Sequence, residues 1–223
     1  MRAEIGLLAT LLLAARPAAA QDDTLQPDVS AVFGSSLYEG VVGEVFHRDP
    51  ATCIRGIRMV TLPSFSAERV SGTCQTQNGF VAYAASPEQS LRYAGQDTSG
   101  VESWGPARAR AVEVERAEVR IDSALAARVA AVWARALRTT RQPPDPDPAM
   151  LSIRGDGETI YFASFAPVML TAHAWSPNPG SLPGAMVALG DAIAAVALRR
   201  APAGTISRAC DRLEALLPAE ANP

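Results

Sequence analysis

The sequence predicts an α+β fold, in which an antiparallel sheet packs against several helices within a single compact domain. Strand-like segments dominate the first half of the chain; one strong helix, a β-hairpin with a third strand and two further helices follow. Strands and helices do not alternate regularly, and this order favours an antiparallel sheet over parallel βαβ units. With 223 residues, of which 48% are hydrophobic, the chain can bury a substantial core.

The first half of the chain is predicted to contribute most of the sheet. Runs rich in β-branched and aromatic residues are separated by segments with turn-forming residues. These runs predict strands at residues 29–33, 40–46, 52–62, 68–75 and 80–85. The polar residues 21–26 before them are expected to form a loose leader.

A short helix is predicted at residues 86–95. Ser86 is a candidate N-cap, and Pro87 suits the first helical position. Gln89 would complete a capping box with Ser86, and Gly95 would end the helix.

The next predicted strand, residues 111–121, changes phase along its length. Val112 and Val114 lie on one face of a regular strand, whereas Val119 and its alternate neighbours lie on the other. If only one face of the strand meets a core, both sets cannot be buried. The pattern therefore predicts a bulge or break near residues 115–116.

The strongest helix signal begins at Asp122 or Ser123, either of which can cap a helix, and extends to about residue 140. Its apolar face comprises Leu125, Val129, Val132, Trp133, Ala136 and Leu137. Arg128, Arg135 and Arg138 lie on the opposite side. These arginines could bind an anion or an acidic partner, or simply form a solvated face.

The second half of the chain begins with a stiff proline-rich segment, residues 142–148, at which the domain could be subdivided. The elements predicted after it are strands at 151–153, 159–165 and 168–175, then helices at 185–199 and 205–217. The glycine-rich residues 155–157 are the expected turn of a β-hairpin.

The first 20 residues have the pattern of a bacterial secretory signal peptide. An apolar run over residues 5–15 precedes Pro17 and the small residues Ala18 to Ala20. Cleavage is expected between Ala20 and Gln21, which leaves residues 21–223 as the mature domain. The apolar run is shorter than the ~20 residues that span a bilayer, so no transmembrane anchor is predicted. We expect the mature protein to be periplasmic or secreted.

Three cysteines, Cys53, Cys74 and Cys210, allow three pairings in an oxidising compartment. We favour Cys53–Cys74, because both residues lie on strand-like segments that can be neighbours in an antiparallel sheet. Cys210 has helical spacing with Ile206 and Leu213, which predicts a buried thiol. The alternative is a disulfide between two chains.

Composition and motifs argue against several functions. A formal net charge of −3 without a basic cluster gives no reason to expect nucleic-acid binding. The chain has two histidines, His47 and His173, and no zinc-ligand motif, so no metal is predicted. There is also no Walker loop or dinucleotide fingerprint, and no cofactor is predicted.

One fragment, Cys53-Ile54-Arg55, resembles the end of the active-site motif of L,D-transpeptidases, exported cell-wall enzymes with a nucleophilic cysteine. The positions that carry Ser-His-Gly in that family hold Pro50-Ala51-Thr52 here. The second cysteine, Cys74, favours a disulfide over a free thiolate.

The leading hypothesis is a non-catalytic exported protein that binds a protein partner or an envelope component. The candidate binding residues are His173, Trp175, Arg128, Arg135 and Arg138. His173 and Trp175 project to one face of a strand, just before a loop rich in proline and glycine. Alternatively, Trp175 covers the core and His173 bonds a backbone carbonyl. The alternative function is a cell-envelope hydrolase or transpeptidase-like enzyme with dispersed catalytic residues; catalysis stays undecided, with the balance against it.

Overall fold

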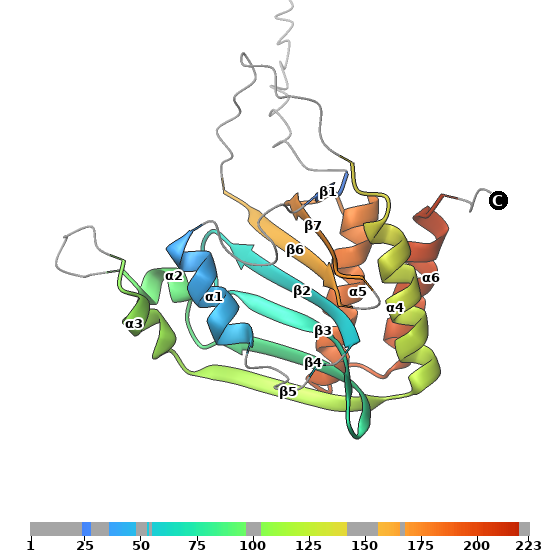
Figure 1. The fold of residues 1–223 in the computed structure, drawn as a ribbon, viewed down its shortest axis with the longest axis horizontal. Coiled ribbons are helices and arrows are strands. Elements are labelled where there is room, and N and C mark those ends of the chain that lie inside the picture. Colours follow the sequence, from blue (N-terminus) through green and yellow to red (C-terminus); the bar gives the residue numbers. More distant parts are fainter. Residues whose placement is uncertain are drawn as a thin grey trace, which may run out of the picture.

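The computed structural model describes residues 24–27, 36–47, 53, 55–96, 104–141, 156–165 and 168–218. In this part of the chain, one antiparallel sheet of seven strands has the order β1-β7-β6-β2-β3-β4-β5. Helices pack against both faces of the sheet (Figure 1). The predicted α+β class, antiparallel sheet and single compact domain are therefore confirmed.

Most of the elements coincide with the predictions. The strands are β1 (Gln26–Pro27), β2 (Arg55–Pro63), β3 (Arg69–Thr76), β4 (Gly79–Pro87), β5 (Val114–Ile121), β6 (Glu158–Ser164) and β7 (Leu170–Trp175). The helices are α1 (Leu37–His47), α2 (Leu91–Ala94), α3 (Pro106–Arg110), α4 (Ser123–Leu137), α5 (Leu182–Ala197) and α6 (Gly204–Leu216). Asp122 caps α4 as predicted, because its carboxylate accepts hydrogen bonds from the Ala124 and Leu125 amides at 2.8 and 3.3 Å.

Each face of the sheet has its own hydrophobic core. The larger core lies under α4, α5 and α6, and its bulkiest buried members include Trp133, Phe162, Met186, Ile193 and Leu213. The smaller core lies under α1, α2 and α3 and includes Val41, Phe46, Val60, Val81 and Leu91. On the central strand β2, Met59 belongs to the larger core and Val60 to the smaller one, as the alternation of a strand requires.

The segment 40–46, predicted as a strand, is instead part of helix α1. Val41, Val42, Val45 and Phe46 are buried at a spacing that fits one face of a helix. The prediction was wrong because β-branched residues favour a strand only where a sheet position is available, and here they cover a sheet face. Ser36 and Glu39 form a reciprocal capping box, the local signal that would have identified the helix.

The helix predicted at 86–95 is shorter and begins later. Ser86 and Pro87 extend β4, and α2 comprises only Leu91–Ala94. The capping-box prediction was wrong because Ser86 remains in the ladder with β5. The acceptor at the start of α2 is the distant carboxylate of Glu68, described below.

The predicted bulge near residues 115–116 is wrong. The β4–β5 ladder is continuous from Phe80↔Ile121 to Pro87↔Val114. Val112 and Val114 pack against the smaller core, and Val119 and Ile121 against the larger one. Val112 lies just before β5, and a regular strand partly buries both sets because helices cover both faces of the sheet, which removes the assumption behind the bulge.

One edge of the sheet gives a further correction. Residues 24–26 are not a loose leader: Leu25 is buried in the larger core, and β1 pairs with β7. Strand β6 pairs with β2 and β7, and the segment 151–153, predicted as its hairpin partner, lies outside the described residues. The signal segment 1–20, the predicted strand at 29–33 and the linker 142–148 lie outside the described residues.

Candidate functional site

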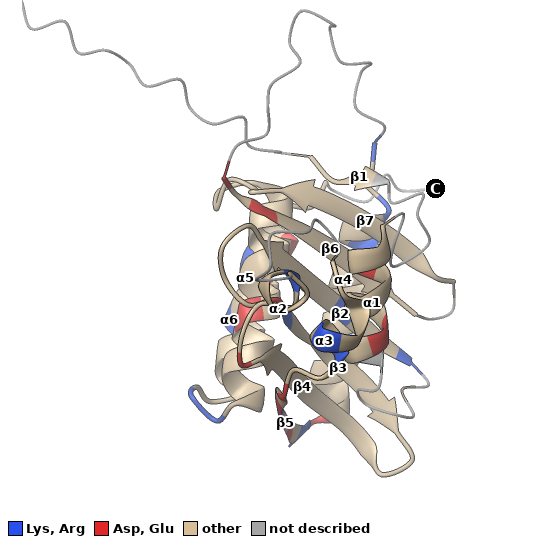
Figure 2. Cartoon of the chain, turned by 90° about the vertical axis from the view of Figure 1, so that its left-hand side faces the viewer, with Lys and Arg blue, Asp and Glu red and all other residues tan. Residues whose placement is uncertain are grey.

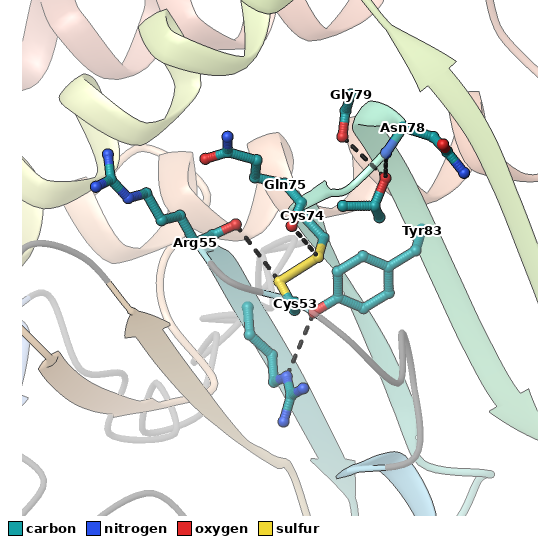
Figure 3. Close-up of a disulfide and its surroundings, with 9 residues drawn as sticks. Cys53, Arg55, Cys74, Gln75, Asn78, Gly79 and Tyr83 are labelled. Atoms are coloured by element: carbon teal, nitrogen blue, oxygen red, sulfur yellow. Dashed lines mark hydrogen bonds between the residues drawn. A yellow bond between two sulfur atoms is a disulfide. The ribbon is translucent and has the colours of Figure 1, made fainter.

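The predicted disulfide is present. Cys53, just before β2, is bonded to Cys74 on β3, with their Cα atoms 5.3 Å apart (Figure 3). The sulfur atoms lie on the smaller-core side of the sheet, close to Tyr83. Gly56 makes this approach possible, because a Cβ there would lie 3.1 Å from the Cys53 Sγ and 2.0 Å from a backbone oxygen.

Cys210 is a buried free thiol in the larger core, as predicted. Burial raises the pKa of Cys210 to about 11, so the thiol is protonated at neutral pH. A protonated, buried thiol is a poor nucleophile.

His173 and Trp175 lie on β7 and face the smaller-core side of the sheet, because their neighbours Ala172 and Ala174 belong to the larger core. The His173 ring lies 6.0 Å from that of Tyr161, whose hydroxyl donates to Glu39 of α1 at 2.9 Å. Both predicted residues are half-buried.

Trp175 packs over the turn before β6. A Cβ at Gly157 would lie only 2.6 Å from the indole, so glycine is required beneath this ring. The position of Trp175 therefore serves packing at this end of the sheet as well as offering a partly exposed ring.

The predicted arginines of α4 have unequal environments. Arg128 binds Glu214 through two hydrogen bonds of 3.1 and 2.8 Å and Asp211 through one of 2.6 Å, which ties α4 to α6. The pKa of Glu214 is lowered, mainly because its carboxylate accepts hydrogen bonds from Arg128. Arg138 is exposed at the C-cap, and Arg135 is half-buried.

These two predicted groups do not form one site. The arginines belong to a helix on the larger-core face, whereas His173 and Trp175 point to the opposite face. Any partner that contacts both must reach around the sheet.

A buried carboxylate that the sequence analysis missed organises the smaller-core face. Glu68 is 0% exposed. Its two oxygens accept hydrogen bonds from the Tyr38 and Ser90 hydroxyls, at 2.5 and 3.1 Å. They also accept from the backbone amides of Leu91 and Arg92 at 2.8 and 3.2 Å. These four donors offset the cost of burying a charge.

The same cluster fixes aromatic and cationic groups around it. Burial, followed by the neighbouring carboxylate of Glu68, raises the pKa of Tyr38 far above its ordinary value, which keeps the hydroxyl a donor. The Tyr38 and Trp104 rings pack edge-on, with their centroids 5.9 Å apart. The Arg92 guanidinium stacks over the Tyr38 ring, 4.9 Å from its centroid. Glu68 therefore joins α1, the β2–β3 turn and α2 into one rigid corner.

Three large apolar side chains are exposed on the segments that this corner joins. Leu37 is 62% exposed, Phe65 69% and Tyr93 42%. Leu37 precedes Tyr38, Phe65 lies in the turn before Glu68, and the Tyr93 hydroxyl donates to the Ser64 carbonyl at 2.8 Å. We call Leu37, Phe65 and Tyr93 the apolar patch.

No single motif marks this corner in the sequence. The hydrogen bonds to Glu68 join residues separated by 22 to 30 positions. The exposed aromatics are isolated in the sequence and were not distinguished from core residues.

Several surface hollows carry charged side chains. One of about 370 Å³ lies between α1 and β5, beside the ion pair of Arg110 with Glu44. Another of about 200 Å³, between α5 and β3, is lined by Arg69 and Asp191 among others. Partial burial raises the pKa of Asp191, and Arg69 opposes this shift. A third, of about 440 Å³, lies between β5 and the turn after α5.

Neither a metal centre nor a membrane span is found where the chain is described. No group of three or more His, Cys, Asp and Glu side chains in the described ranges could hold a metal ion. Among the described helices, none has the length and hydropathy needed to cross a membrane.

Comparison with known proteins finds no family model, no curated protein and no solved structure that matches this chain.

Proposed function

We propose that the protein is an exported, non-catalytic protein that binds a protein partner or an envelope component through the apolar patch. The observation that carries this proposal is that exposed apolar side chains lie on segments anchored by hydrogen bonds. Leu37, Phe65 and Tyr93 are solvent-exposed, yet their segments are held by the hydrogen bonds to the buried Glu68.

Exposed aromatic side chains on anchored segments suit recognition. A partner that covers them removes apolar surface from water, and segments that are already held in place lose little backbone entropy on binding. Tyrosine and arginine are also the residue types enriched among the energetically dominant contacts of interfaces. Arg92, exposed next to Tyr93 and stacked on Tyr38, adds a cation to the edge of the patch.

Export is the second part of the proposal. The signal-like segment before Gln21 and the Cys53–Cys74 bond both support maturation in an oxidising compartment, because such bonds persist there and are rare in the cytosol. The same bond argues against a transpeptidase-like reaction, since Cys53 is not a free thiolate.

The proposal is tested by capture from an envelope extract, followed by titration of the purified partner. Replacing Phe65 and Tyr93 together by alanine should raise the dissociation constant at least about tenfold. Truncating exposed anchor residues removes about 1 kcal/mol or more of binding free energy. The matched control is Met169→Ala with Leu216→Ala, which truncates two exposed apolar side chains outside the patch. Equal affinity of the two double variants would contradict the proposal.

A further inference from the structure

The sheet ends in two very different edge strands. Strand β1 has two residues, Gln26 and Pro27, and a proline has no amide to donate to another strand. Strand β5 has eight residues, contains no proline and forms a continuous ladder with β4. Within the described residues it pairs with β4 alone, and it runs along the lower border of the sheet in Figure 1. A long, regular edge of this kind is a template for a further strand.

The backbone of β5 presents alternate residues at its outer side. The carbonyl of Glu113, just before β5, accepts from the Glu88 amide at 3.0 Å, so odd-numbered residues direct their backbone groups toward β4. The ladder is uninterrupted, so this alternation holds along the whole strand. The amides and carbonyls of Arg116, Glu118 and Arg120 therefore point away from β4, where a further antiparallel strand can pair with them.

The two faces of β5 differ in chemistry. Even-numbered side chains lie on the smaller-core face, where Val114 packs, and these include the exposed Glu118 and Arg120. Odd-numbered side chains lie on the larger-core face, where Val119 and Ile121 are only partly buried. In the described part of the chain, the ion pairs do not include Glu118 or Arg120. Figure 2 shows acidic and basic residues along this strand. A strand added at this edge would meet alternating charges on one face and apolar side chains on the other.

The order of charges on β5 is complementary to itself. When two identical strands pair antiparallel about a two-fold axis perpendicular to the sheet, side chains of the same face become neighbours. An axis through Val119 places Glu118 opposite Arg120 of the second copy, and Arg120 opposite Glu118. Arg116 then lies opposite Asp122 of the second copy, which is again a pair of opposite charges. Cross-strand pairs of opposite charge stabilise a sheet, whereas like charges destabilise it.

The neighbouring registers are less favourable. An axis through either sequence neighbour of Val119 would place two like charges directly opposite each other. An axis through Ala117 would place Glu115 opposite Val119 on the larger-core face. With the axis through Val119, Ala117 meets Ile121 and Val119 meets its own counterpart, so the partly buried apolar side chains of the two copies become neighbours. Charge and burial therefore favour the same register.

We propose that the protein forms a two-fold symmetric dimer, in which β5 pairs antiparallel with β5 of a second copy in the register centred on Val119. The paired segment is 116–122, because α4 begins at Ser123 and leaves the edge (Figure 1). This pairing joins two sheets into one. It is small compared with a standard protein interface, so the dimer should form reversibly. The proposal does not depend on the apolar patch, whose residues lie outside β5.

Reversing a charge tests the pairing, with sedimentation velocity over a concentration series as the measurement. Glu118→Arg places arginine opposite Arg120 at two symmetric positions. It should raise the dissociation constant of the dimer at least about tenfold, because symmetry makes the substitution count twice. Adding Arg120→Glu exchanges the two charges and should restore dimerisation, which separates specific pairing from loss of the fold. The matched control is Glu113→Arg, which makes the same charge change just before β5.

Cross-linking tests the register. At the axis, the Val119 Cα atoms of the two copies would lie about 4.5 Å apart in a pair without mutual hydrogen bonds, a separation that a disulfide can span. Mild oxidation should therefore link Val119→Cys into a covalent dimer. Ala117→Cys reports the alternative register and should stay unlinked. Cys210 is buried and does not compete.

Four results would overturn the proposal. The first is a wild-type protein that stays monomeric up to about 1 mM. The second is a Glu113→Arg control that weakens the dimer as much as Glu118→Arg does. The third is a charge exchange that fails to restore dimerisation although circular dichroism shows a folded protein. The fourth is cross-linking of Ala117→Cys in place of Val119→Cys.

Discussion

The two faces of the sheet are stabilised in different ways. Under α4, α5 and α6, the larger core is almost wholly apolar, and Trp133 secures α4 by packing edge-on against Phe162 and donating to the Ala163 carbonyl. Under α1, α2 and α3, the smaller core is combined with the buried charge of Glu68 and with a disulfide.

The smaller-core face also contains a second buried charge. Arg58 is buried, donates to the Tyr83 hydroxyl at 3.3 Å and lies 5.3 Å from the Phe165 ring centre. Apolar packing tolerates substitutions of similar volume, whereas a buried charge requires particular partners. The comparison teaches that the face with the smaller core obtains a defined geometry from polar contacts, and this face carries the apolar patch.

Removing the Glu68 carboxylate should have the largest effect on this contrast. Glu68→Ala leaves four buried donors without their acceptor, so we expect the free energy of unfolding to fall by about 3 kcal/mol. Urea denaturation measures the loss. Glu68→Gln keeps one acceptor oxygen and should lose less.

The matched control for this prediction is Glu88→Ala, which truncates an exposed glutamate just after β4. If the Glu68 and Glu88 variants lost the same stability, the polar corner would not organise the smaller-core face. A double-mutant cycle with Tyr38→Phe separates the Tyr38 contact from the rest.

Breaking the disulfide should have the next largest effect. The bond closes a loop between residues 21 positions apart, and Cys53→Ser with Cys74→Ser is expected to cost about 3 kcal/mol in the chain-entropy model. Thermal unfolding with and without a reducing agent measures it. Reduction should not further destabilise the double variant, and an equal response of both proteins to reduction would contradict the prediction.

The smallest effect concerns the larger-core face and depends on pH. Arg128 lowers the pKa of Glu214, so this contact stabilises the fold above the ordinary carboxyl pKa and is lost as pH falls through the lowered value. Arg128→Gln should therefore lower Tm slightly near neutral pH. Its Tm should converge with that of the wild type in the acid range.

The charge-matched control for the pH series is Arg138→Gln, which changes an exposed arginine at the C-cap of the same helix. It should show no such convergence. A constant Tm difference for Arg128→Gln across the acid range would mean that packing of the arginine stem, rather than its charge, stabilises α4 against α6.

Local patterns identified the elements whose signals are strong over several residues. The i, i+3 and i+4 spacing of Val129, Val132 and Trp133 predicts α4 wherever the helix packs, and Asp122 marks its start. The strands β2, β3 and β4 and the helices α5 and α6 were also identified, as was the pairing of Cys53 with Cys74. Their patterns did not reveal how many faces of the sheet are covered.

The candidate sites were the least predictable part. Residue type and position made Arg128 and Trp175 candidates, but their contacts with Glu214 and Gly157 join segments that are distant in the sequence. The corner around Glu68 likewise depends on contacts between such segments. Residue type shows which side chains can bind; only folding shows which of them meet.

By itself, the sequence determined the α+β class, most of the element boundaries and the disulfide, because these follow from periodicity, capping and spacing within short stretches. The tertiary structure alone decided that β5 runs without a bulge and that Glu68 is buried. The physical reason is that local sequence specifies which residues are apolar. Whether a second layer of helices exists to bury them depends on contacts across the whole chain.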